Sequence, residues 1–597
     1  MRELPAHRLL GRAPVHRRSG RPCTAARDAG AAAAPPAERT CLGAYLRRTA
    51  SLSWPRAAWA RSAGWDPSGG SKLTALPVQC EPHRLRRSAR RATASAAVLL
   101  LLTACGDRSS TSSCGLAPAG VVSDRFLSVA VDMDQLAGGT FWDPAGGPDQ
   151  VPVSPYDFSR ERLRNLARVL APAYLRLGGS ASDRTWYDLS ASPSAPPAGF
   201  DLVLTRKQWD AAHEFARDLG FATVLTVAAG AGPRDAERRW TPDNARQLLA
   251  YTAERGHPLE VLEFGNEPNL FAVRANLSGY TAEAFANDLA TFRALRDEVM
   301  PGTPIFAPGN IYTRTQGEDI VAGLVFGPRA TEILPLVGRE LDGVNYHYYA
   351  AISTRCPTGP RVGLDGALEP AYLDGIDETA AAVETLRDAH APDRPVWLTE
   401  TGGQSCGGQP GVADRFANTF WFLNTLGRLA RRGHEVVVRQ TLTGSTYGLI
   451  DEVSLEPRPD YWAALLWRRL MGRQALSLPL DLETATAASG LRVYAHCLRD
   501  GAPGSVALLA LNPSRATMAS LTLAGLGLRG NAHLHVASAA DLASTRIRID
   551  GIELTTAPDG TPPDLSPTVQ RIESLAVAPG TWVFAAFPDA RVGACGG

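Results

Sequence analysis

Short apolar segments rich in β-branched and aromatic residues recur every 38 to 53 residues through the middle of the chain. The stretches between them have helical periodicity, and several end at glycine, as helices often do. Strands that alternate with helices predict a parallel sheet, and the continuous hydrophobicity of each strand indicates burial on both faces. Eight such units predict an α/β fold, a (β/α)8 TIM barrel rather than an open sheet. The predicted strands are residues 126–133, 173–180, 222–229, 260–268, 304–310, 343–349, 396–403 and 436–444.

A different pattern follows the helix predicted at residues 459–471. Residues 490–590 hold short strand-like runs separated by Gly, Pro and Asn, which is typical of an all-β sandwich. We therefore predict a barrel over residues 123–472 and a C-terminal β-sandwich domain over residues 473–597.

The first hundred residues differ from the rest. Residues 1–83 are rich in Arg, Ala and Pro without a sustained apolar period, so we interpret them as disordered or as an over-extended gene start. Residues 84–104 have the layout of a signal peptide, with basic residues at 84–91 and an apolar run at 96–102. That run is far shorter than the roughly 20 residues that span a bilayer. A chance apolar patch in a low-complexity leader is the alternative interpretation.

The end of this segment, Leu102-Thr103-Ala104-Cys105, resembles a bacterial lipobox. On this interpretation Cys105 is the lipidated first residue of the mature protein, and residues 105–122 form a tether and a possible first strand. We therefore expect an exported bacterial lipoprotein, periplasmic or at the cell surface, that contacts the membrane only through a lipid anchor.

The net charge of +1 hides an uneven distribution. Residues 1–104 carry 18 of the 61 Lys and Arg residues and 5 of the 60 Asp and Glu residues, which leaves 43 basic and 55 acidic residues, a balance of −12, in residues 105–597. An acidic body without a basic stripe has no means of holding a polyanion by charge alone. We expect no nucleic-acid partner, and we expect a monomer.

The cysteines fit export. None of the five that follow Cys105 has CxxC spacing, so we predict no metal site. In an oxidising compartment, disulfides are the natural interpretation. The five are Cys114, Cys356, Cys406, Cys497 and Cys595.

Polar residues collect at the C-terminal ends of the predicted strands. In (β/α)8 barrels this end carries the active site, so the pattern predicts a catalytic face. The polar residues are Asp132, Ser180, Asn266, Glu267, Asn310, His347 and Glu400.

Two glutamates on this face have the chemistry that cleaves a glycosidic bond. Glu267 closes the fourth strand within FGNEPN, and Glu400 closes the seventh within WLTETGG. Cleavage requires a proton donor for the leaving oxygen and a carboxylate at the anomeric carbon, and retaining enzymes hold the two about 5–5.5 Å apart. Asn266 is expected to bond the sugar 2-OH. The alternative is that Glu267 caps the next helix and Glu400 forms a surface ion pair.

From Phe126 to Cys595 the chain resembles glycoside hydrolase family 79, which includes heparanases and β-glucuronidases. The segments that carry the resemblance are FLSVAVD, LAPAYLRLGGSASD, FGNEPN, HYY, VWLTET, VVVRQ, YGLID, PDYW and LRVYAHC. The resemblance implies a barrel with a β-sandwich, retention by double displacement, and no metal or cofactor. It also implies a substrate with β-linked glucuronic acid, within an oligosaccharide or polysaccharide.

The resemblance also implies roles for individual residues. Glu267 matches the acid/base and Glu400 the nucleophile, while Gly407 and Tyr447 match positions whose backbone N–H and hydroxyl hold the uronate carboxylate. The other expected substrate-binding residues are Asp132, Ser180, Asn266, Arg314, His347 and Tyr349.

Each of these roles has a structural alternative. His347 is otherwise a core histidine, Tyr447 a packing residue and Asp132 a loop cap. Arg314 is otherwise the partner of Glu318 one helical turn away.

Some features depart from the family pattern. The segment at residues 190–200 is short and not basic, so we expect a single chain that needs no proteolytic activation. Cys406 replaces a family glycine just before Gly407, and we predict that it pairs with Cys356 to pin two substrate loops. The resemblance implies a second disulfide, between Cys497 and Cys595.

Two other functions share these features. A barrel glycosidase acting on a neutral β-linked sugar would keep both glutamates and differ only in the pocket for the carboxylate. A non-catalytic glycan-binding lipoprotein would keep the fold, although retention of both glutamates argues against it.

Overall fold

The structure, a computed structural model, describes residues 115–319, 324–528 and 530–596. The predictions for residues 1–83, for the signal peptide at 84–104 and for lipidation of Cys105 lie outside the described residues, as does Cys114.

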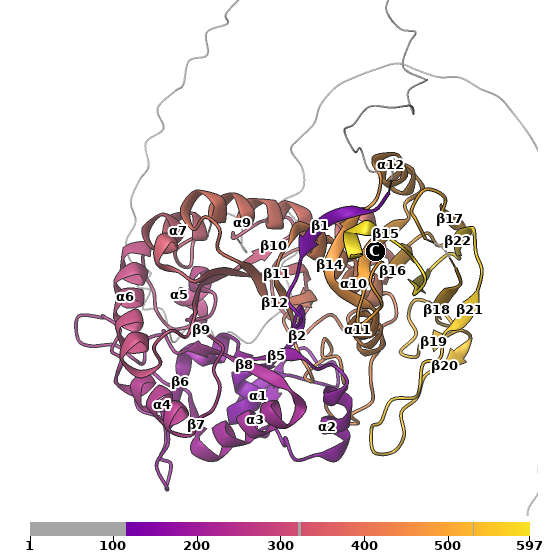
Figure 1. Cartoon of the computed structure of the whole chain (residues 1–597). Helices are drawn as coiled ribbons and strands as arrows, with labels where there is room; N and C mark the ends of the chain where they lie inside the picture. Colours follow the sequence, from indigo (N-terminus) through magenta and orange to yellow (C-terminus); the bar gives the residue numbers. More distant parts are fainter. Residues whose placement is uncertain (1–114, 320–323, 529, 597) are drawn as a thin grey trace, which may run out of the picture. The chain divides into compact units, whose positions relative to one another are not determined.

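Eight parallel strands close into a barrel in the order in which they follow one another along the chain (Figure 1). Each predicted strand corresponds to one of them, so the (β/α)8 prediction is confirmed. The barrel strands are β2 (Leu127–Asp132), β5 (Ala173–Gly178), β8 (Phe221–Val227), β9 (Val261–Phe264), β10 (Ile305–Thr313), β11 (Gly343–Ile352), β12 (Val396–Ser405) and β13 (Val436–Arg439).

A helix follows each barrel strand and covers the outside of the barrel (Figure 1). Helix α3 shows how the sequence sets such a unit: Thr205 and Gln208 form a capping box at its start, and Gly220 ends it in the left-handed conformation. The covering helices are α2 (Glu161–Arg168), α3 (Arg206–Leu219), α4 (Asp243–Glu254), α6 (Ala282–Val299), α7 (Ala330–Val337), α9 (Ile376–His390), α10 (Asn418–Arg432) and α11 (Pro459–Leu470).

Short elements decorate the connections. They are α1 (Met133–Ala137), α5 (Phe271–Arg274), α8 (Pro370–Leu373), the 3-10 helices η1 (Ser180–Arg184), η2 (Pro268–Leu270), η3 (Gly338–Glu340) and η4 (Leu364–Gly366), and the strand pairs β3 (Thr140–Trp142) with β4 (Gln150–Pro152) and β6 (Thr185–Asp188) with β7 (Leu202–Thr205).

The barrel interior changes from apolar to polar along the strands. Near the strand starts, the ring of Trp397 lies 4.8 Å from that of Tyr174 and 4.6 Å from that of Phe306. These rings belong to a buried apolar cluster that plugs this half of the barrel. Side chains two residues further along a strand point to the same side, and there Tyr174 is followed by Arg176, and Val261 by Glu263. The charged side chains therefore lie next to the apolar cluster, on the side toward the C-terminal ends of the strands.

The C-terminal domain is built on a nine-stranded antiparallel sheet with a two-stranded sheet, β17 (Ala519–Thr522) with β22 (Ser574–Val577), beside it. Leucines and valines of both sheets share one apolar cluster, which makes two layers. The nine strands are β1 (Ala117–Val121), β14 (Met471–Ser477), β15 (Arg492–Leu498), β16 (Val506–Asn512), β18 (Ala532–Ser538), β19 (Arg548–Ile549), β20 (Ile552–Glu553), β21 (Thr568–Gln570) and β23 (Thr581–Phe587). Helix α12 (Leu480–Ser489) and the 3-10 helix η5 (Gly593–Cys595) complete the domain.

Strand β1 lies in the segment expected to be a tether and possible first strand. It pairs antiparallel with β14, so a stretch that precedes the barrel in sequence joins the C-terminal sheet. Trp582 of β23 donates to the Thr419 hydroxyl of α10 over 2.9 Å, which ties the sheet to the barrel. Neither the barrel nor the sheet domain, within the part of the chain that the structure describes, has a helix of the length and apolarity that crossing a bilayer requires.

Two disulfides are present among the described residues. Cys497–Cys595 links β15 to η5 across 98 residues, and Cys356–Cys406 links the loop after β11 to the loop after β12. Both pairs are the ones that the sequence predicted.

Candidate active site

Arg176 is the centre of the polar network inside the barrel. Its side chain projects from the middle of β5 and is only 1% exposed. Nε donates to Glu263 over 2.7 Å, and Nη1 donates to Glu400 over 2.9 Å. Nη2 donates to the side-chain oxygen of Asn266 over 2.9 Å and lies 3.3 Å from Nε2 of His347. One cation therefore holds groups from strands β9, β11 and β12.

The charges in this network stabilise one another. Burial of the Arg176 guanidinium disfavours its charge, but the carboxylates of Glu263 and Glu400 raise the pKa of Arg176 above its usual range. Burial also opposes ionisation of Glu263, but Arg176 and the hydrogen bond from Thr226 lower the pKa of that carboxyl. Glu263 accepts further hydrogen bonds from Thr226 (2.6 Å) and Asn345 (2.7 Å). It is a buried counterion that three donors hold in place.

Glu267 follows β9 in the left-handed backbone region, with φ 57°. It precedes the 3-10 helix η2, but its side chain makes no capping hydrogen bond there. Instead the carboxylate points into the barrel and accepts a hydrogen bond from Nδ1 of His347 over 3.0 Å. Burial raises the pKa of Glu267 to about 7. This carboxyl is therefore poised to give and take a proton near neutral pH.

Glu400 stands on β12 and is 6% exposed, so it does not form a surface ion pair. Its Oε1 accepts a hydrogen bond from the hydroxyl of Tyr349 over 2.7 Å, and its Oε2 accepts one from Arg176. Two fixed donors hold the carboxylate in one orientation. Such an arrangement suits a group that must approach a reacting atom along one direction.

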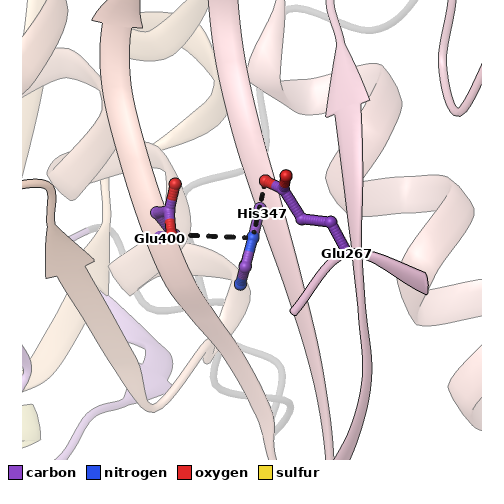
Figure 2. A group of neighbouring side chains, drawn as sticks. All are labelled: Glu267, His347 and Glu400. Atoms are coloured by element: carbon purple, nitrogen blue, oxygen red, sulfur yellow. Dashed lines mark hydrogen bonds and ion pairs between the residues drawn. The ribbon is translucent and has the colours of Figure 1, made fainter. Parts of the chain in front are cut away.

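His347 lies between the two glutamates (Figure 2). Its Nδ1 is 3.0 Å from Glu267 and 3.9 Å from Glu400. Because a guanidinium can only donate, the contact with Arg176 requires that Nε2 of His347 accepts. The proton is then on Nδ1 and points at Glu267. Burial lowers the pKa of His347 to about 4, so the ring is neutral at pH 7. His347 is buried, but it contacts the acidic pair rather than the apolar core.

Glu267, His347 and Glu400 each offer a ligand atom within 4.8 Å of the other two, a spacing that could hold a metal ion. The protons argue against that role, because the imidazole nitrogen facing the carboxylates carries the hydrogen. A cation, Arg176, also already pairs with Glu400. The donor set fits proton transfer better than metal binding.

Asp183 fixes the residue beside Glu267. Its carboxylate accepts hydrogen bonds from the backbone N–H of Asn266 (3.1 Å) and of Ala229 (3.1 Å). Burial raises the pKa of Asp183 to about 7. Arg176 donates to the side-chain oxygen of Asn266, which fixes the orientation of the amide and leaves its NH2 group to donate to a ligand.

Asp132 closes β2 and has two partners. One oxygen caps α1 through the N–H of Asp134 (3.1 Å), and the other accepts a hydrogen bond from Gln440 (3.2 Å). Burial raises the pKa of Asp132, and the charge of Glu400 contributes to the rise. The capping role considered in the sequence analysis is therefore present, beside the active centre.

Tyr447 and Gly407 come from the loops after β13 and β12. Tyr447 is buried and packs on Phe141. Burial raises its pKa, and the nearby carboxylates of Asp132 and Glu400 raise it further. Gly407 has φ +76°, and its carbonyl accepts hydrogen bonds from Thr446 and Arg355. Among the described residues, no acceptor faces its N–H.

Two predicted residues have no contact with the glutamates within the described parts of the chain. Arg314 donates to the carbonyl of Ala350 over 3.3 Å and does not pair with Glu318. Glu318 instead accepts from Asn310 and from the N–H of Ala330. Ser180 is half-buried at the start of η1.

Sequence reasoning missed Arg176, Glu263, Asp183 and Gln440. A signal was present for the first two, because each is a charged residue inside an otherwise apolar strand, AYLRLG and VLEF. Charged residues are almost never fully buried unless they are paired. Asp183 and Gln440 had no comparable signal.

Comparison with known proteins agrees with this geometry. Residues 149–427 match the family model described as Glycosyl hydrolase family 79, N-terminal domain. Heparanase-like protein 1 of Arabidopsis thaliana is 31% identical over 379 residues, 60% of this chain and 65% of that protein. Heparanase of Gallus gallus is 28% identical over 67% of this chain and 79% of its own length. Baicalin-beta-D-glucuronidase of Scutellaria baicalensis is 26% identical over 72% of this chain and 84% of its own length.

The fold is also similar to a solved structure, the GH51 arabinofuranosidase from Xanthomonas axonopodis pv. citri. The TM-score is 0.54 at 16% sequence identity, over 79% of this chain and 98% of that chain. This likeness concerns the fold alone, and it supports the barrel with an appended sheet domain.

We predict that Arg176→Met destabilises the protein by about 3–5 kcal/mol, because it leaves Glu263 and Glu400 buried without their cation. The free energy of unfolding from denaturant titration measures the effect. Arg239→Met is the matched control, since its ion pair with Asp235 is at the surface and is worth about 1 kcal/mol or less. Equal stability of the two variants would contradict a central role for Arg176.

Proposed function

The chain belongs to glycosyl hydrolase family 79 through its barrel domain, and from that premise we propose that it hydrolyses β-linked glucuronides with retention of configuration. Glu400 is the nucleophile and Glu267 the acid/base. The observation that carries the proposal is the proximity of the two carboxylates, whose oxygens lie within 4.8 Å of one another on either side of His347.

The separation supports retention over inversion. An inverting enzyme keeps its carboxyl groups about 6.5–9.5 Å apart to leave room for a water, whereas a retaining enzyme holds them at about 5–5.5 Å. Oxygens within 4.8 Å of one another fit the shorter separation of a retaining enzyme better than the longer one of an inverting enzyme.

In the first step Glu400 attacks the anomeric carbon while the protonated Glu267 gives its proton to the leaving oxygen. The bond from the sugar to its aglycone breaks as the bond to Glu400 forms, which yields a glycosyl ester. Tyr349 and Arg176 keep Glu400 aligned for the attack.

In the second step Glu267 is a carboxylate and removes a proton from water. The water oxygen attacks the anomeric carbon and Glu400 leaves, so the configuration is restored. The Nδ1–H of His347 points at Glu267 and stabilises its ionised form between the two steps.

Two features support a pocket for the uronate: the N–H of Gly407, which meets no acceptor among the described residues, and the position of Tyr447 near Glu400 and Asp132. The names of two relatives, heparanase and baicalin-beta-D-glucuronidase, point to the same class of substrate.

We predict hydrolysis of an aryl β-D-glucuronide with kcat/KM at least about a hundredfold above that for the aryl β-D-glucoside or β-D-xyloside, because only the glucuronide presents a carboxylate to the pocket. Proton NMR should show the β-anomer of glucuronate as the first product. Glu400→Gln, which keeps the shape of the side chain, is the negative control. Preference for a neutral sugar would overturn the choice of substrate, the α-anomer as first product would overturn retention, and full activity of Glu400→Gln would overturn the assigned nucleophile.

The pH dependence follows from Glu267. Since the first step needs its acid form and burial raises its pKa to about 7, kcat/KM for a poor leaving group should fall as pH rises through about 7. A dinitrophenyl glucuronide needs no proton, so its profile should lack this fall. Glu267→Gln should lose at least about a hundredfold in kcat on the poor leaving group. A basic limb that survives in Glu267→Gln would assign the titration to another group.

We also propose that Cys105 carries a lipid anchor. The support is the lipobox-like Leu102–Cys105 and the presence of two disulfides, which fits an oxidising compartment. An alkyne fatty acid fed to a bacterial host should label the full-length protein but not Cys105→Ser. Cys114→Ser is the control and should be labelled as wild type is. Equal labelling of wild type and Cys105→Ser would refute the anchor.

A further inference from the structure

We infer that Arg355 is a positioning residue for recognition of the substrate carboxylate, and that the Cys356–Cys406 disulfide holds it in place. The inference rests on the proposed function and adds a residue and a mechanism to it: the anionic substrate is selected by a cation that orders the pocket loops.

Arg355 joins four segments of the chain at one point. Nη1 donates to the carbonyl of Gly407 over 3.2 Å and to the hydroxyl of Ser445 over 2.6 Å. Nη2 donates to the carbonyl of Asp143 over 2.8 Å. These partners lie in the loop after β12, the loop after β13 and the β3–β4 connection, while Arg355 itself follows β11. A planar fork of donors is the side chain best suited to such a junction.

The disulfide lies directly beside this junction. Cys356 follows Arg355 and Cys406 precedes Gly407, so a covalent bond and a hydrogen bond cross between the same two loops at neighbouring residues. The covalent link limits how far Arg355 can move from Gly407. The disulfide therefore keeps the Arg355 guanidinium within hydrogen-bonding distance of the Gly407 carbonyl.

The contact matters because it orients Gly407. Thr446 also donates to the Gly407 carbonyl, through its N–H (3.0 Å) and its hydroxyl (2.7 Å). A β-carbon at Gly407 would clash with Trp142 and Arg355, so no residue with a side chain fits at this position. The Gly407 N–H has no hydrogen-bond acceptor among the described residues, which leaves it available to a ligand.

Arg355 also brings a positive charge that makes no direct ion pair within the described ranges. Its hydrogen bonds go to neutral oxygens. Burial lowers its pKa, and the nearby charges of Asp143, Tyr447 and Asp414 act in the opposite direction. A guanidinium remains charged in proteins at any ordinary pH. The pocket that Gly407 and Tyr447 form is thus biased toward an anion.

The test compares wild type with Arg355→Gln on an aryl β-D-glucuronide. We expect KM to rise at least tenfold and kcat to change less than threefold, because the glutamates and Arg176 are untouched. The inhibition constant of free glucuronate should rise with KM. Arg361→Gln is the matched control: this arginine donates to the carbonyls of Ile352 (3.0 Å), Ser353 and Cys356 and, among the described residues, to no group of the loops after β12 and β13. Its KM should stay within twofold of wild type.

Two further measurements keep the test decisive. Arg355→Lys keeps the charge but not the fork, so it should show a smaller rise in KM, and it replaces Arg355→Gln if that variant does not fold. Cys356→Ser with Cys406→Ser should raise KM several-fold, and a thiol reductant should raise KM of wild type but not of this double variant.

The possible results distinguish a failure of the proposed function from a failure of the role inferred for Arg355. Wild type that does not hydrolyse the glucuronide sinks the proposed function, and the inference with it. Active wild type with unchanged KM in folded Arg355→Gln, a loss confined to kcat, or an equal rise in Arg361→Gln sinks the inference alone.

Discussion

The buried guanidinium of Arg176 is the interaction on which the active centre depends. Taking a cation and two carboxylates out of water costs several kcal/mol for each ion, and only close, well-directed contacts offset that cost. Here the contacts reach Glu263, Asn266, His347 and Glu400, so the same geometry that stabilises the charges also sets the distance between the reacting groups. Stability and chemistry cannot be separated at this position.

The barrel explains why such a network has a place to form. Its floor is an apolar cluster around Trp397, and the inward positions two residues further along the strands are polar. Burial raises the pKa of Glu267 and lowers that of His347. The protonation of both side chains is therefore set by their depth in the barrel more than by any single neighbour.

The loops carry a different task. Gly407, Tyr447 and Arg355 follow three different strands, and a disulfide and a hydrogen bond link the loop of Arg355 to the loop of Gly407. On the proposed function, the groups that bind the substrate lie on loops and the reacting groups lie at the strands, so specificity can change while the chemistry is kept. Cys406 belongs to these loops.

The sequence by itself determined the barrel, the sheet domain and the two glutamates, because periodicity, turn residues and a short motif are local signals. The disulfide pairings were predicted in another way: Cys356–Cys406 from the two loops that flank the site, and Cys497–Cys595 from the family resemblance. Only the tertiary structure decided that Arg176 and Glu263 are buried partners, that Asp183 orients Asn266, and that β1 pairs with β14 far along the chain. It also decided that Arg314 bonds the carbonyl of Ala350, and that Asp132 caps a helix as well as lying beside the active centre. The physical reason is that a buried charge or a strand edge pairs with a group that comes near it only when the barrel closes. That group is distant in sequence.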